Sequence, residues 1–130
     1  MGEAVETLCL DTHVVVWLFA AQTQKLSPKA AEYIEKYDLT VSPMVSLELR
    51  YLYEIGRIRC DKSQILAELQ STIGLEVDEA PFARVVERSL TLGWCRDPFD
   101  RLIVAHAIYR DAMLLTRDKN ILSHCKRAVW

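Results

Sequence analysis

Short apolar runs alternate with helical segments along almost the whole chain, and this alternation constrains the fold more than any other feature. The runs of strand type are residues 8–10, 39–41, 75–77, 113–116 and 128–130. The continuous apolar run Leu8-Cys9-Leu10 is typical of a strand buried on both faces, and residues 75–77 are a short candidate strand. Strands that alternate with helices imply right-handed crossovers, so the sequence predicts an α/β fold with a parallel sheet and helices on both faces.

Capping residues mark the helices between the strands. Ser27-Pro28, Ser42-Pro43 and Asp97-Pro98 each place an N-cap before a proline, whose missing N–H costs nothing at the first helical position. Gly56 and Gly74 suit the left-handed position that ends a helix. We expect helices at residues 14–20, 28–37, 43–55, from 61 or 63 to 73, from 98 onward and around 121–122.

One further helix is expected between the third strand and residue 93. Asp78 is interpreted as its N-cap and Gly93 as its end. Its inward-facing residues are predicted to be Phe82, Val85, Val86 and Leu90.

The totals favour one small cytoplasmic domain. The chain has 130 residues, of which 51% are hydrophobic, enough for the core of a single domain spanning residues 1–130. A formal charge of -2 predicts no general attraction to nucleic acid or to an anionic membrane, so any nucleic-acid contact must be local. The four scattered cysteines favour reduced thiols. The first ten residues lack the pattern of a signal peptide, and no apolar stretch has membrane-spanning length.

Five acids lie where strands end or helices begin. Asp11 and Asp118 follow strands, Asp97 and Asp100 fall in the first turn of a helix, and Glu48 lies on an apolar helix stripe. Sites in open parallel sheets form beyond the carboxyl ends of the strands, where the strand order reverses. Acids gathered there would repel one another and raise each other's pKa unless they bound hard cations, so we expect Mg²⁺ or Mn²⁺. Such metals support hydrolysis of phosphodiesters.

Simpler interpretations compete with this one. Taken alone, Asp97 and Asp118 would be helix caps, and Glu48 could pair with Arg50 or Arg96. Trp17 would belong to the core or to a partner interface. The three histidines lack metal-ligand spacing and are interpreted as surface or supporting residues: His13, His106 and His124. The basic neighbours of the acids are either solvated or contact RNA phosphates: Arg101, Arg117 and Lys119.

Together the motifs resemble the PIN-domain ribonucleases, specifically the VapC-like toxins of bacterial type II toxin–antitoxin pairs. The resemblance spans nearly the whole chain. It rests on Leu10-Asp11-Thr12, Ser46-Leu47-Glu48-Leu49, Asp97-Pro98-Phe99-Asp100-Arg101 and Leu115-Thr116-Arg117-Asp118. By resemblance, the metal-site acids are Asp11, Glu48, Asp100 and Asp118, with Asp97 accessory and with Thr12 and Thr116 supporting them.

The resemblance implies a three-layer α/β/α sandwich around a parallel sheet of four to five strands. It also implies endonucleolytic cleavage of RNA that depends on Mg²⁺ or Mn²⁺, homodimerisation, and inhibition by a small antitoxin. The alternative is a non-catalytic PIN-like module that binds a protein through its apolar first helix. A phosphatase with Asp11 as nucleophile is a remote third option, because no second aspartate follows two residues later.

Overall fold

Five parallel strands form the centre of the molecule, in the order β3-β2-β1-β4-β5. The computed structural model describes residues 6–130. Residues 1–5, which belong to the first ten residues considered above for a signal peptide, lie outside the described residues. The strands are β1 (Thr7–Leu10), β2 (Asp38–Val41), β3 (Glu76–Val77), β4 (Met113–Leu115) and β5 (Ala128–Val129). The chain runs outward from β1 to β3 and then returns to β4, so the strand order reverses between β1 and β4.

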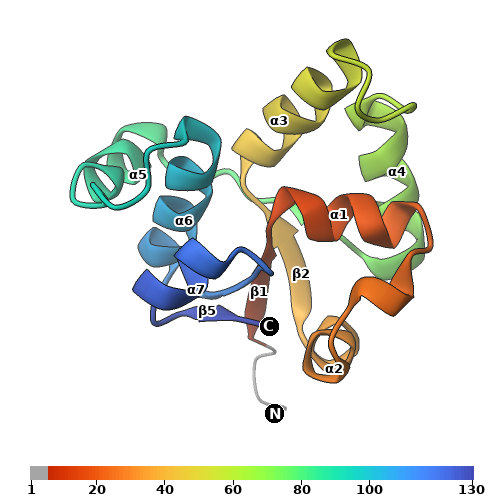
Figure 1. The fold of residues 1–130 in the computed structure, drawn as a ribbon, viewed down its shortest axis with the longest axis horizontal. Coiled ribbons are helices and arrows are strands. Elements are labelled where there is room, and N and C mark those ends of the chain that lie inside the picture. The colour runs from red at the N-terminus through yellow and green to blue at the C-terminus, as the bar shows by residue number, and fades with distance from the viewer. Residues whose placement is uncertain (1–5) are drawn as a thin grey trace.

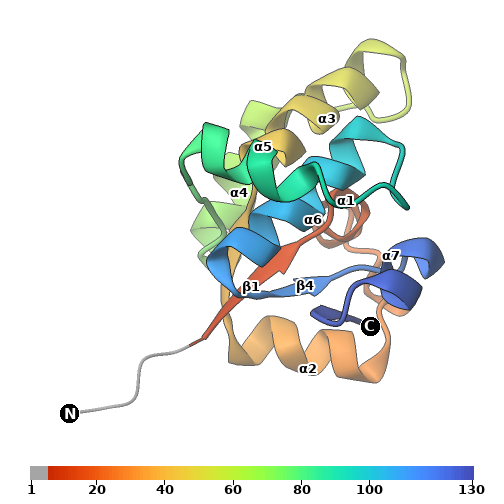
Figure 2. The same cartoon turned by 90° about the vertical axis from the view of Figure 1, so that its left-hand side faces the viewer.

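Helices cover both faces of this sheet. They are α1 (Thr12–Phe19), α2 (Pro28–Lys36), α3 (Pro43–Glu54), α4 (Lys62–Ile73), α5 (Phe82–Ser89), α6 (Pro98–Arg110) and α7 (Lys119–His124), with a short 3-10 turn at Thr23–Lys25. Figure 1 shows α5, α6 and α7 on one side of the sheet and α1, α2 and α4 on the other. Helices α3 and α2 lie at opposite ends of the molecule in both views (Figures 1 and 2). The predicted three-layer α/β/α sandwich with a parallel sheet is confirmed.

The predicted capping chemistry sets the helix boundaries. The Ser27 hydroxyl accepts a hydrogen bond from the Ala30 N–H, and the Asp97 carboxylate accepts one from the Asp100 N–H. Gly56 follows the end of α3 with φ +77, and Gly74 caps α4 with φ +71. Residues with a Cβ rarely adopt such positive φ angles. Local signals therefore fix where most of these helices begin and end.

The core consists of the strands and the helix faces that pack on them. Leu8, Leu10, Leu114 and Leu115 are fully buried, as expected for strands covered on both sides. The four cysteines are free thiols, as predicted, and Cys9 lies in the core. Within the described residues, no helix is both long and apolar enough to cross a membrane.

The helix predicted after Asp78 is shorter and less buried than its sequence suggests. It begins at Phe82, follows Pro81 without a side-chain cap, and ends at Ser89 rather than near Gly93. The predicted inward positions of Phe82 and Leu90 are wrong, because these side chains are 67% and 62% exposed. Helix α5 packs against α6 through a narrow face centred on Val85 and Ser89, and the rest of its surface is exposed or half-buried.

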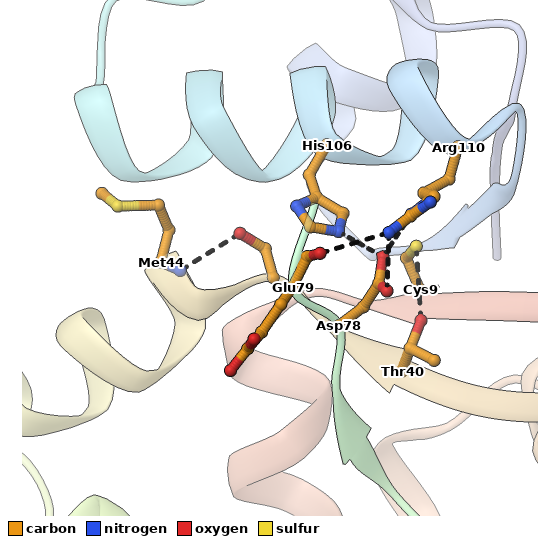
Figure 3. A network of polar contacts seen from close by, with 8 residues as sticks. Cys9, Thr40, Met44, Asp78, Glu79, His106 and Arg110 are labelled. Atoms are coloured by element: carbon orange, nitrogen blue, oxygen red, sulfur yellow. Dashed lines mark hydrogen bonds and ion pairs between the residues drawn. The ribbon is translucent and has the colours of Figure 1, made fainter. Parts of the chain in front are cut away.

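Asp78 joins β3 to α6 instead of capping α5 (Figure 3). Its carboxylate lies 2.7 Å from Nε2 of His106 and accepts hydrogen bonds from Nε and Nη2 of Arg110 at 2.7 and 3.1 Å. Burial alone would raise the pKa of Asp78, but Arg110 and His106 outweigh it and lower the pKa. His106 is 2% exposed, so the prediction of an ordinary surface or supporting residue is corrected: it anchors α6 to the sheet.

Replacing Asp78 by asparagine should lower the free energy of unfolding by about 1–2 kcal/mol at neutral pH, because charge-assisted hydrogen bonds to two α6 side chains are lost. Urea denaturation measures this. Asp61→Asn is the matched control, since Asp61 also pairs with an arginine, Arg50, but has no buried partner such as His106, and surface pairs contribute about 0–1 kcal/mol. Equal losses in both variants would show that the contact of Asp78 with buried His106 adds nothing to a surface pair.

Candidate active site

The site lies where the strand order reverses, at the carboxyl ends of β1 and β4. The Asp11 N–H donates to the Leu115 carbonyl at 3.0 Å, which ties the end of β1 to the end of β4. Asp11 then caps α1, and Asp118 caps α7 by accepting from the Ile121 N–H at 2.9 Å. Both acids thus stand at the point of a parallel sheet where ligands usually bind.

Asp11 is the most buried acid of the group, with 4% of its surface exposed. Its Oδ2 accepts a hydrogen bond from the Thr116 hydroxyl at 2.7 Å, and its Oδ1 accepts one from the Thr12 N–H at 2.8 Å. Burial raises the pKa of Asp11, and these two hydrogen bonds only partly oppose it. The carboxylate is therefore rigidly held and poorly solvated.

Glu48 reaches the same place from α3. The Thr12 hydroxyl donates to its Oε1 at 2.5 Å, and burial raises the pKa of the half-buried Glu48 carboxyl, with the nearby charge of Asp11 adding to the effect. The alternative pairing with Arg50 is wrong, because that guanidinium binds Glu54 and Asp61. No ion pair of the described residues neutralises Glu48.

The first turn of α6 contributes Asp97 and Asp100. Asp97 caps the helix through a 3.1 Å bond from the Asp100 N–H, so its capping role is shown. Asp100 is half-buried, and burial together with the charges of Asp11 and the other three acids raises its pKa to about 7. The mutual repulsion expected from the sequence is thus concentrated on Asp100.

One cavity of about 340 Å³ collects these side chains. It is lined by Asp11, His13, Trp17, Glu48, Asp97, Asp100, Arg117 and Asp118. All five predicted acids are therefore brought together. The supporting residues Thr12 and Thr116 lie behind them, fully buried.

Only some of the basic residues predicted to contact RNA lie at the cavity. Arg117 lines the cavity, and Lys119 is exposed at the start of α7. Arg101 is half-buried, and its guanidinium donates to the carbonyls of Ser89 and Leu90, so it holds the end of α5 and is not free in solvent as expected.

Two cavity residues had no site role in the sequence analysis. His13 and Trp17 are four residues apart on α1 and share one face of that helix. That spacing was the available signal, but the apolar residues around Trp17 favoured a position in the core. Trp17 does pack against the core, and it also borders the cavity.

The oxygen ligands of the cavity fit a hard divalent cation, although the side chains do not surround a single position for it. In residues 6–130, no three side chains of His, Cys, Asp or Glu are arranged to hold a metal ion together. Mg²⁺ keeps several of its waters and is usually bound through one or two carboxylates, so it does not require such an enclosure. Oxygen ligands, excess negative charge and raised carboxyl pKa values at one cavity all suit Mg²⁺ or Mn²⁺.

Replacing Thr116 by valine should destabilise the protein by about 1–2 kcal/mol, because the buried Asp11 carboxylate loses a donor and the Asp118 N–H loses its acceptor. Thermal denaturation measures this. Thr40→Val is the matched control: its hydroxyl makes only a long 3.6 Å contact with Cys9 on a neighbouring strand. A larger loss in Thr40→Val would contradict the support that Thr116 gives to Asp11.

Comparisons with known proteins agree with this geometry. The PIN domain matches residues 8–127. Ribonuclease VapC22 of Mycobacterium tuberculosis (strain ATCC 25618 / H37Rv) is 36% identical over 124 residues, which cover 91% of this chain and 92% of that protein. The family match begins inside β1 and ends one residue before β5.

Solved structures show the same fold. VapBC2 from Rickettsia felis, bound to a DNA fragment from its promoter, has a TM-score of 0.66 at 19% identity over 95% of this chain and 96% of the other. A toxin–antitoxin complex from Klebsiella pneumoniae gives the same four values. By its sequence and its fold, the chain belongs to the PIN-domain family, among the VapC-like proteins.

Proposed function

We propose that this chain is an endoribonuclease that depends on Mg²⁺ or Mn²⁺ and acts as the toxin of a toxin–antitoxin pair. The observation that carries the proposal is the convergence of five carboxylates on one cavity at the reversal point of the sheet. The relative that is 36% identical is called a ribonuclease, and two structures of the same fold are called toxin–antitoxin or VapBC complexes. Together these favour hydrolysis of RNA over other phosphoester chemistry.

In this proposal Asp11, Glu48, Asp100 and Asp118 hold the metal ions, and Asp97 keeps α6 in place beside them. A divalent cation held by these residues would lower the pKa of a water and offset negative charge on the scissile phosphate.

The remaining residues prepare the site. Thr116 and Thr12 donate to Asp11 and Glu48 and so fix the orientation of these carboxylates before substrate arrives. Arg117, which lines the cavity, contacts an RNA phosphate, and Lys119 adds positive charge at the rim. Arg101, which is bound to α5, serves the fold rather than the RNA.

The direct test incubates the purified protein with a random-sequence single-stranded RNA pool and with total tRNA. Mg²⁺, Mn²⁺ or a chelator is present in parallel reactions. Cleavage of either RNA with metal, and its loss with chelator, is the expected result. RNA that stays intact with both metals would overturn the proposal.

A non-catalytic module that binds protein is the competing function, favoured by the partly exposed apolar surface of α1 and α3. Calorimetric titration with Mn²⁺ separates the two. The nuclease should bind Mn²⁺ with a heat that Asp11→Asn removes, whereas a pure binding module should give no heat that depends on Asp11.

We further propose that residues 1–130 act as one PIN domain, that the protein works as a homodimer in the cytoplasm, and that a small antitoxin inhibits it. Four free thiols suit a reducing compartment. Expression in a bacterial host should arrest growth, and expression of Asp11→Asn should not. Arrest by both proteins alike would contradict a toxin that acts through its acids.

A further inference from the structure

Trp17 stands on the wall of the acid cavity, where α1 leads away from Asp11. A helix rises 1.5 Å per residue, so position 17 lies about 9 Å along the axis from position 11. His13 lies one turn earlier on the same face, with its ring centroid 6.3 Å from that of Trp17. An aromatic surface therefore begins close to the carboxylates.

Two cationic side chains cover the indole ring. Cζ of Arg117 lies 6.0 Å from the ring centroid, and Nζ of Lys25 lies 5.6 Å from it. Both residues are exposed, and both side chains are long and flexible. Trp130 packs edge-on at 5.8 Å and fixes the orientation of the ring. The ring is thus packed against Trp130 at one edge, while the two side chains that cover it are exposed and can move away.

We propose that Trp17 is a stacking platform for one base of a single-stranded RNA, the base next to the phosphate held at the acids, and that Arg117 moves from the ring to an RNA phosphate when that base binds. This inference rests on the proposed nuclease function. It adds a nucleotide subsite to that function and assigns it to α1.

Charge explains why such a platform is needed. The cavity holds five acids and the chain carries a formal charge of -2, so the site repels an RNA backbone before metal binds. Stacking of a base on an aromatic ring does not depend on net charge and is tolerant of base identity. It also contributes more than an exposed cation–π contact, so exchanging Arg117 for a base is favourable.

The kinetic test compares Trp17→Leu and Trp17→Phe with the unaltered protein on the random-sequence RNA pool. Trp17→Leu should raise KM by about 5- to 100-fold, the range of base–aromatic stacking, with kcat changed less than about 3-fold. Trp17→Phe should recover much of the loss, because a phenyl ring still stacks. Arg117→Gln should raise KM, and the slope of log KM against log salt concentration should fall by about one, the contribution of one phosphate contact.

Tyr33→Leu is the matched control. Tyr33 is also half-buried, with Nζ of Lys29 5.7 Å from its ring centroid and Tyr37 edge-on at 5.0 Å, but it lies on α2, away from the acids. KM should stay unchanged in this variant.

A fluorescence measurement decides the matter if Trp17→Leu does not fold. In Asp100→Asn, which should leave RNA intact, the pool should quench tryptophan emission, and adding Trp17→Phe should remove most of the quenching. A folded Trp17→Leu protein with unchanged KM, a loss confined to kcat, or quenching that persists without Trp17 would overturn the stacking inference while leaving the nuclease intact. Failure of the unaltered protein to cleave any RNA would instead overturn the proposed function, and the subsite with it.

Discussion

Replacing Asp100 by asparagine is expected to lower metal-dependent RNA cleavage by at least about 100-fold, the loss that follows when several kcal/mol of transition-state stabilisation by metal are removed. The same variant should be as stable as the unaltered protein or more stable when metal is absent, because Asp100 is the acid on which burial and four neighbouring charges act together. Initial rates on RNA and thermal denaturation with a chelator give the two readings.

Asp111→Asn serves as the control for this prediction. Asp111 is exposed at the opposite end of α6, caps it in a left-handed conformation that asparagine also tolerates, and pairs with Arg127. Its replacement should leave cleavage unchanged. The variant Asp97→Asn separates capping from chemistry at Asp97, because asparagine is an equally good N-cap and only the negative charge is removed. Lost stability together with retained cleavage in Asp100→Asn would show that Asp100 is structural.

Raising the pH from near 3.8 to about 7 is expected to destabilise the metal-free protein. The pKa of Asp100 is about 7 in the folded chain, above its ordinary value of 3.8, so in this range the folded state binds more protons than the unfolded state. The free energy of unfolding therefore falls as the pH rises, by an amount on the order of 2–3 kcal/mol after allowance for solvent screening. Urea denaturation across this range measures the slope.

Asp100→Asn should flatten that slope but not abolish it, because the pKa values of Asp11 and Glu48 are raised in the same sense. Asp78 acts in the opposite sense: its lowered pKa gives stability that is lost only as the pH falls below the ordinary value. Added Mg²⁺ should restore stability near neutral pH by binding the folded state. A steeper slope in Asp100→Asn than in the unaltered protein would refute the assignment.

The sequence predicted the parts of the fold that depend on local chemistry. Proline and serine caps located α2 and α3, and a left-handed glycine located the end of α4, because each acts within a few residues. The acids could also be placed, since strand ends of a parallel sheet meet at one edge. Their catalytic roles stay a prediction.

Contacts between distant segments could not be predicted in the same way. Asp78 has the spacing of an N-cap, but its carboxylate instead accepts hydrogen bonds from Arg110, which is 32 residues away, and contacts His106. Trp17 sits in an apolar run, and the cations that distinguish it from a core residue come from a turn after α1 and from the end of β4. Single-sequence patterns carry no information about such partners.

The bond between Thr116 and Asp11 spans 105 residues of the chain, and this separation determines when the acid cavity can assemble. As the chain leaves the ribosome, Asp11, Glu48 and Asp100 emerge first, but the strand that completes their surroundings is β4, close to the end of the sequence. A nascent or truncated chain that ends before Met113 lacks β4, one of the two partner strands of β1, and leaves Asp11 without the hydroxyl of Thr116. Assembly of the site thus waits for nearly complete synthesis, which delays any cleavage of RNA by the very chain that a ribosome is still making.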